Sequence, residues 1–220
     1  MLIIFDLDDT LIDTSGALIP LKLRAALQAM IKAGLKINSQ ERALATLLEI
    51  DSSSPNGKET LMQFLDGIRA DSRFLEVGVK EYYGASANDF IISMLPSAAE
   101  TLTKLHEDHD LVLITSGDQK QQQLKMKKAG INSKLFRRII ICDGYSKKAH
   151  YRQIMEEFKC KPTDIIVCGD KFDIDLLPAK ELGMTSVHML WGRALRLSVR
   201  GEGPDYCIRY LPELLKIVGP

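Results

Sequence analysis

The sequence of 220 residues predicts an α/β fold, in which helices cover both faces of a parallel β-sheet and a helical segment follows the first strand. Two observations predict this fold. From residue 95 onward, short apolar runs alternate with segments of helical periodicity, a pattern typical of parallel sheets. Between the first apolar run and residue 95, roughly 80 residues show helical periodicity without such alternation. The second stretch is therefore expected to be a helical insert.

The N-terminal part begins with an apolar run, residues 2–5, that is expected to be a buried strand. Helices are then expected over residues 21–33, 39–50 and 58–70, with one or two more between residues 76 and 94. Gly34 is a plausible end for the first of these helices, and the turn-rich residues 51–57 separate the second from the third.

The alternating part begins with a helix over residues 98–106, because Ser97 and Glu100 have the spacing of a capping box. Strands are expected at residues 111–114, 139–142, 165–168 and 186–189. Helices are expected from residue 119 to Gly130, over residues 151–158, from the end of the third of these strands to Gly183, and over residues 211–218.

The composition restricts the class of partner. The 29 basic and 29 acidic residues give zero formal net charge, so neither a nucleic acid nor an anionic membrane is expected as a partner. We expect no signal peptide and no bilayer-spanning segment. The four cysteines have no CxxC spacing, which favours free thiols in a reducing cytoplasm.

Two carboxylates, Asp6 and Asp8, follow the first apolar run. In open parallel sheets the carboxyl ends of the strands are where ligands bind. Two acids held together there repel each other, and Mg²⁺ would offset this repulsion because it takes one or two carboxylates together with phosphate oxygens. The stretch therefore indicates a metal and phosphate site. The alternative is a solvated acidic turn after an edge strand.

Three later segments add polar groups. Residues 111–114 lead into Thr115 and Ser116, whose hydroxyls could hold phosphate oxygens, although such residues are also common in ordinary turns. Lys147 and Lys148 precede an expected helix and could neutralise a transferred anionic group. Residues 165–168 form a buried strand that is followed by glycine and by several acids, and these include Asp170 and Asp175.

Taken together, these segments resemble the four motifs of the haloacid dehalogenase (HAD) superfamily, in the family's order. The first is an apolar strand followed by Asp-x-Asp-x-Thr, here residues 6–10, and the second matches at Thr115. The third is a lysine, for which Lys147 is preferred over Lys148 because of its distance from the helix, although the local sequence departs from the family's pattern. The fourth motif is a pair of acids, which Asp170 and Asp175 match in the longer of the family's spacings.

The resemblance implies a Rossmann-like core, residues 1–13 and 93–220, with a helical cap at residues 14–92. It also implies a Mg²⁺-dependent phosphatase that acts on a small phosphorylated metabolite through an aspartyl-phosphate. The resemblance implies that Asp6 is the nucleophile and Asp8 the general acid and base. The implied phosphate-binding residues are Thr115, Ser116 and Lys147 or Lys148. The implied metal site comprises Asp6, Asp8 (through its backbone carbonyl), Asp170 and Asp175.

Other activities stay open at this point. Haloacid dehalogenases lack the second Asp, so Asp8 favours phosphoryl transfer. A phosphosugar mutase would keep the same core, and a catalytically idle binding protein would keep the same fold. The sequence leaves open whether Asp175 ligates the metal directly, through water, or orients another group. It does not determine the substrate or the oligomeric state.

Overall fold

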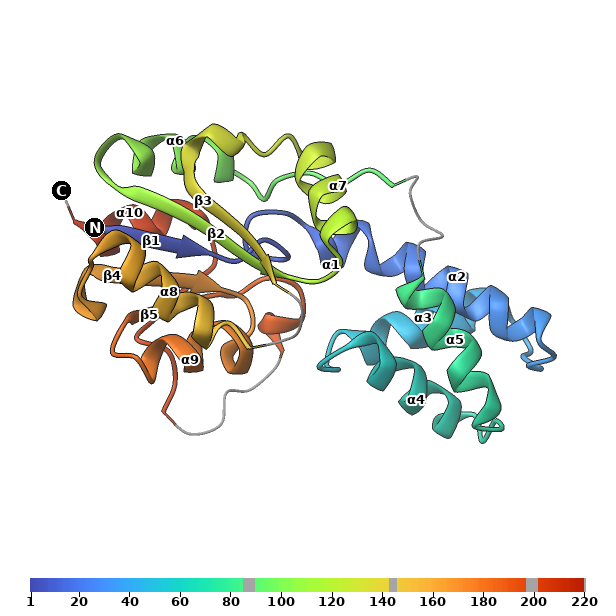
Figure 1. Ribbon diagram of the computed structural model, residues 1–220. Helices are drawn as coiled ribbons and strands as arrows, with labels where there is room; N and C mark the ends of the chain where they lie inside the picture. Colours follow the sequence, from blue (N-terminus) through green and yellow to red (C-terminus); the bar gives the residue numbers. More distant parts are fainter. Residues whose placement is uncertain (85–89, 143–145, 197–201, 220) are drawn as a thin grey trace. The chain divides into compact units, whose positions relative to one another are not determined.

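The computed structural model describes residues 1–84, 90–142, 146–196 and 202–219 (Figure 1). The chain divides into two compact units. The first contains residues 1–13, 92–194 and the described C-terminal stretch 202–219. The second lies within residues 14–91, to which Leu195 and Arg196 are added. Each unit has its own buried core.

The first unit contains a six-stranded sheet whose pairings are all parallel, in the order β3-β2-β1-β4-β5-β6. Its strands are β1 (Leu2–Phe5), β2 (Asp110–Ser116), β3 (Phe136–Cys142), β4 (Ile165–Gly169), β5 (Thr185–Met189) and β6 (Tyr206–Ile208). The predicted α/β fold is confirmed. The strand β6 was not predicted, because it has only three residues and is shorter than the apolar runs that predicted the other strands.

Helices cover both faces of this sheet (Figure 1). They are α6 (Ala98–Asp108), α7 (Gln119–Ala129), α8 (Lys148–Phe158), α9 (Leu177–Lys180) and α10 (Leu214–Val218). One face packs α8 and α9 onto alternate residues of the central strands, including Leu2, Ile4 and Val167. Because successive side chains of a strand point to opposite faces, the other residues of β1, Ile3 and Phe5, are buried on the opposite face.

One predicted helix cap is wrong. The helix α6 begins at Ala98 as expected, but Ser97 has φ of 60°, and its side chain caps no backbone N–H group. A capping serine normally has an extended backbone. Here the backbone carbonyl of Ser97 instead accepts hydrogen bonds from the backbone N–H and the hydroxyl of Thr101.

The segment after β4 is also more complex than the single helix that was expected. A π-helical turn, Phe172–Leu176, precedes the short α9, and Gly183 ends the segment with φ of 79°. This π-helical turn begins two residues after Asp170 and contains Asp175.

The second unit is helical. Its helices are α1 (Thr14–Ala17), α2 (Ile19–Lys32), α3 (Gln40–Asp51), α4 (Gly57–Gly67) and α5 (Arg73–Tyr83). The side chains of Ser39 and Asn56 cap α3 and α4. The apolar faces of α2 to α5 enclose a core that includes Leu23, Leu61 and Phe64. The expected helices are therefore found, with boundaries shifted by a few residues.

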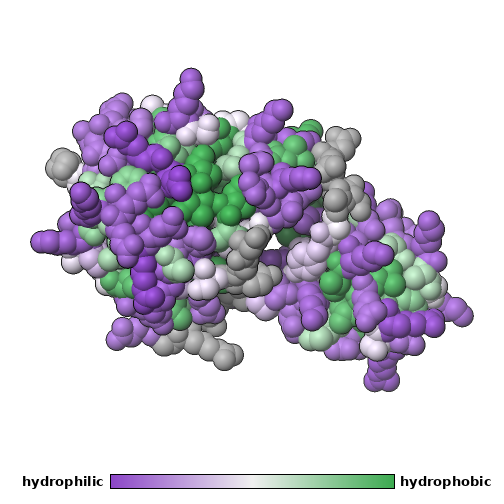
Figure 2. All heavy atoms as spheres, in the orientation of Figure 1, coloured by the Kyte–Doolittle hydropathy of each residue, from purple (hydrophilic) through white to green (hydrophobic). Residues whose placement is uncertain are grey.

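Hydrophilic side chains cover most of the visible surface of both units, and a hydrophobic area lies over β3 in the first unit (Figure 2). This strand is at the edge of the sheet, so residues 139–141 are only partly buried. Among the described residues, no helix combines the length and the apolar character needed to cross a bilayer.

Candidate active site

The candidate site lies where the strand order of the sheet reverses. After β1 the chain adds β2 and β3 on one side, and then returns to add β4 on the other side of β1. The carboxyl ends of the strands at such a switch point are the usual ligand site of an open α/β sheet. Asp6 directly follows β1, and its backbone N–H donates to the carbonyl of Cys168 in β4 at 2.9 Å. Asp170 directly follows β4.

Three buried carboxylates meet at this point. Asp6, Asp170 and Asp175 each offer an oxygen, and these atoms lie within 4.8 Å of one another. The carboxylate of Asp8 lies outside this group. Lys125 and Gln122 contact the Asp8 carboxylate.

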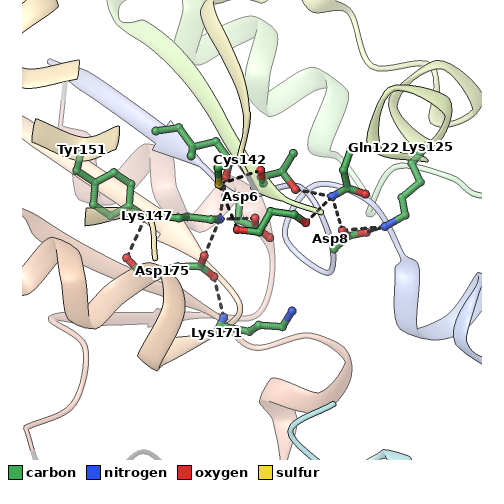
Figure 3. A network of polar contacts seen from close by, with 12 residues as sticks. Asp6, Asp8, Gln122, Lys125, Cys142, Lys147, Tyr151, Lys171 and Asp175 are labelled. Carbon is green, nitrogen blue, oxygen red and sulfur yellow. Dashed lines mark hydrogen bonds and ion pairs between the residues drawn. The ribbon is translucent and has the colours of Figure 1, made fainter. Parts of the chain in front are cut away.

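Lys147 is the cation that joins two of these acids (Figure 3). Its ammonium group forms ion pairs with Asp6 at 2.5 Å and Asp175 at 2.6 Å, and donates to the carbonyl of Ile114 at 2.8 Å. Burial disfavours the charged lysine, yet Asp175 and Asp6 raise its pKa well above the usual value. Because an ammonium group has three donors, these three acceptors saturate it.

Burial also acts on the acids. It raises the pKa of Asp6 to about 6, against the opposing effect of Lys147. It raises the pKa of Asp170 well above its usual value, although the nearby Lys171 lowers it. The Oδ1 atom of Asp170 is buried and has no hydrogen-bond partner among the residues that the structure describes. A buried acceptor without a partner is costly, so this atom is suited to a ligand.

The position of Asp175 depends on close backbone packing. Its Oδ2 accepts a hydrogen bond from the backbone N–H of Lys171 at 3.0 Å, and its backbone carbonyl accepts one from the hydroxyl of Tyr151 at 3.0 Å. Gly169, the last residue of β4, leaves room for it. A Cβ atom at residue 169 would lie 2.6 Å from the Cβ of Asp175 and 2.7 Å from its Oδ2.

We therefore expect Gly169→Ala to displace Asp175 and to lower catalytic activity by roughly 100-fold, the scale of a misplacement of about 1 Å. Steady-state hydrolysis of a phosphate ester, with circular dichroism to check folding, is the measurement. Gly203→Ala is the matched control, because a Cβ atom there meets nothing within 4 Å. Normal activity of a folded Gly169→Ala protein would contradict this account of the site.

The carboxylate of Asp8 is held by two residues of α7. Lys125 places its ammonium group 2.8 and 2.9 Å from the two oxygens of Asp8. The side-chain amide of Gln122 donates to Asp8 Oδ2 at 2.9 Å (Figure 3). It also donates to the hydroxyl oxygen of Thr115 at 2.6 Å. Asp8 is thus linked to the end of β2.

The remaining candidate residues, Thr115, Ser116 and Lys148, lie in different surroundings. Thr115 is buried at the end of β2, and the hydroxyl of the next residue, Ser116, lies 3.3 Å from the sulfur of Cys142. Lys148 pairs with Glu181 at 2.6 Å on the surface. Of the two candidate lysines, Lys147 is therefore the one that contacts the carboxylates.

Sequence reasoning did not identify Gln122, Lys125, Tyr151 or Lys171 as part of this site. Gln122 and Lys125 stand three residues apart in a mostly polar helix, so no contrast in hydropathy distinguishes them from their polar neighbours. Tyr151 is the first residue of the helix that was expected over residues 151–158. Lys171 adjoins Asp170, and its pKa is raised by Asp170 and other acids although burial opposes its charge. The position of Lys171 beside Asp170 was the sequence signal that could have identified it as part of the site.

Comparison with known proteins agrees with this fold and site. Residues 3–189 match the family described as haloacid dehalogenase-like hydrolase. The chain belongs to this family.

Curated relatives indicate which type of enzyme within this family the chain resembles. The glyceraldehyde 3-phosphate phosphatase of Methanocaldococcus jannaschii is 31% identical over 98% of this chain and 96% of its own length. That of Pyrococcus furiosus is 28% identical over 98% and 92%. The phosphoglycolate phosphatase of Vibrio parahaemolyticus is 26% identical over 99% and 95%. The chain is thus an enzyme, a phosphatase of the HAD-like family.

Solved structures share the fold. A predicted phosphoglycolate phosphatase from Haemophilus somnus superposes with a TM-score of 0.70 at 20% identity, over 99% of this chain and 97% of the other. A putative HAD hydrolase from Bacillus subtilis, solved bound to magnesium, has a TM-score of 0.65 at 15% identity, over 100% and 98%.

Proposed function

We propose that this phosphatase hydrolyses a small phosphorylated metabolite in a Mg²⁺-dependent reaction, with Asp6 as the nucleophile. The observation that carries the proposal is the group formed by Asp6, Asp170 and Asp175 at the switch point, with Lys147 bound to two of them. A carboxylate that attacks phosphorus forms an aspartyl-phosphate, which splits one difficult displacement into two easier ones.

The donor set fits a hard divalent cation, because carboxylate oxygens are its preferred protein ligands. Asp6 and Asp170 would hold the ion together with the backbone carbonyl of Asp8, and the partnerless Oδ1 of Asp170 supports this assignment. Both oxygens of Asp175 already accept hydrogen bonds, from Lys147 and from the backbone of Lys171, which favours a water-mediated or orienting role for Asp175. When bound, Mg²⁺ would neutralise charge on the phosphoryl oxygens.

The protein groups would carry two steps. Asp6 attacks phosphorus, and Asp8 gives a proton to the leaving alkoxide. Asp8 then takes a proton from water, which attacks the aspartyl-phosphate and releases phosphate and Asp6. Lys147 would hold Asp6 ionised and oriented, which its saturated contacts support. Thr115 and Ser116, at the end of β2, would bind phosphoryl oxygens.

Glyceraldehyde 3-phosphate is the first candidate substrate and phosphoglycolate the second, because relatives that align with almost the whole chain carry these names. A reducing, cytoplasmic setting is part of the proposal, supported by the free thiols of the four cysteines.

We expect phosphate release from glyceraldehyde 3-phosphate or phosphoglycolate with Mg²⁺ and none after chelation with EDTA. A colorimetric phosphate assay over a panel of metabolite phosphates measures this, with p-nitrophenyl phosphate as the generic substrate. Full activity in excess chelator would contradict the metal assignment. Interconversion of glucose 1-phosphate and glucose 6-phosphate without phosphate release would instead indicate a mutase. Binding of a metabolite phosphate without turnover would indicate a catalytically idle binding protein.

The helical unit within residues 14–91 would serve as the cap that selects the substrate. We expect a chimera carrying the corresponding segment of a phosphoglycolate phosphatase to change the ranking of metabolite phosphates while keeping hydrolysis of p-nitrophenyl phosphate. The same phosphate-release panel measures this ranking. An unchanged ranking in a folded chimera would assign specificity to the first unit.

A further inference from the structure

We infer that Gln122 and Lys125 are positioning residues, which hold Asp8 for its two proton transfers and join it to the phosphate-binding end of β2. This inference rests on the proposed function, in which Asp8 is the general acid and base. It adds two residues of α7 that the four sequence motifs do not include.

The helix α7 buries polar side chains. This helix is mostly polar, and its two buried side chains are those of Gln122 and Lys125, while the apolar Leu124 and Met126 are only partly buried. Residues three apart lie on one face of a helix. Burying an ammonium group costs free energy unless it is paired. The inward face of α7 therefore makes polar contacts, and apolar packing does not explain why these two side chains are buried.

The contacts of Gln122 and Lys125 fix the Asp8 carboxylate in place. Lys125 reaches both oxygens of Asp8, at 2.8 and 2.9 Å, and so fixes the carboxylate at two points. The Nε2 atom of Gln122 lies 2.9 Å from Asp8 Oδ2, 2.6 Å from Thr115 Oγ1 and 3.2 Å from the carbonyl oxygen of Ser116. One amide group thereby links the acid and base to two residues at the end of β2.

The proposed reaction uses Asp8 twice. In the first step a bond forms between Asp6 and phosphorus, the phosphorus–oxygen bond of the ester breaks, and the proton of Asp8 passes to the leaving oxygen. In the second step water attacks phosphorus, its proton returns to Asp8, and the bond to Asp6 breaks. The same carboxylate must therefore meet two different oxygens, and a misplacement of about 1 Å can cost roughly 100-fold in rate.

A double-mutant cycle tests the inference. Lys125→Met should lower kcat/KM for glyceraldehyde 3-phosphate or phosphoglycolate, whichever the wild type prefers, by about 10–100-fold. The loss in the first step should be smaller for p-nitrophenyl phosphate, because its leaving group departs without protonation. Rapid-quench mass spectrometry should then show phosphate accumulating on Asp6. In the Asp8→Asn background, Lys125→Met should cause less than about a 2-fold further loss, since coupled residues are not additive.

Three further variants complete the design. Lys125→Arg keeps the charge and the two-point contact and should recover much of the activity. Gln122→Met removes the amide donors and should repeat the selectivity change of Lys125→Met, which keeps the test valid if the latter fails to fold. Lys127→Met is the matched control, an exposed lysine of the same helix, and should match the wild type.

Additive losses in the cycle, or equal losses for alkyl and aryl phosphates in both α7 variants, would overturn the inference while leaving the proposed function intact. A wild-type protein that hydrolyses no phosphate ester with Mg²⁺ would instead refute the proposed function, and the inference with it.

Discussion

Asp6→Asn should abolish turnover, with a loss of roughly 10⁴-fold or more, because an amide cannot attack phosphorus as a carboxylate does. The wild type, quenched in acid during turnover, should carry phosphate on the peptide that contains Asp6, and the variant should carry none. The variant should still fold, since an asparagine of the same size keeps an acceptor oxygen for Lys147.

The matched control for this prediction is Asp164→Asn. Asp164 is an exposed residue that immediately precedes β4, so its substitution repeats the chemical change away from the site. Its activity should equal that of the wild type. Phosphate trapped on a residue other than Asp6, or turnover that survives in a folded Asp6→Asn protein, would mean that the nucleophile is assigned wrongly.

Lys147→Met should impair both stability and catalysis. The ammonium group of Lys147 is almost completely buried between Asp6 and Asp175. Its removal leaves neighbouring carboxylates without their cation, and breaking a buried pair in this way costs about 3–5 kcal/mol. For a chain of this size we expect the thermal midpoint in EDTA to fall by roughly 10 °C. Phosphate release should fall by at least about 100-fold, because Asp6 loses its orientation.

Lys148→Met provides the control for Lys147, because it is the same substitution one residue away. The pair between Lys148 and Glu181 is partly exposed, and such pairs contribute only about 0–1 kcal/mol. We expect a thermal midpoint and an activity close to those of the wild type. The reverse result would mean that Lys148 has the role assigned here to Lys147. In that case the Lys147→Met protein would be stable and active and the Lys148→Met protein inactive. Differential scanning fluorimetry and the phosphate assay measure both variants.

The sequence by itself predicted most of the secondary structure and the edge of the sheet that carries the candidate site. Strands such as residues 2–5 and 165–169 are continuous apolar runs, and this local property identifies a strand buried on both faces. Asp6 and Asp170 end these runs, so their position at one edge of a parallel sheet could be predicted before the strand order was known. Two features differ from the prediction, because neighbouring structure decides them: the short β6 is present, and the side chain of Ser97 does not cap α6.

Only the tertiary structure decided which side chains meet. Lys147 and Lys148 are adjacent and chemically identical in the sequence, but the start of α8 places one in the interior and the other at the surface. Asp8 stands two residues from Asp6, yet its side chain turns to Gln122 and Lys125, which are 114 and 117 residues away. Such pairs depend on the packing of α7 against the sheet, and local periodicity carries no record of contacts at that separation.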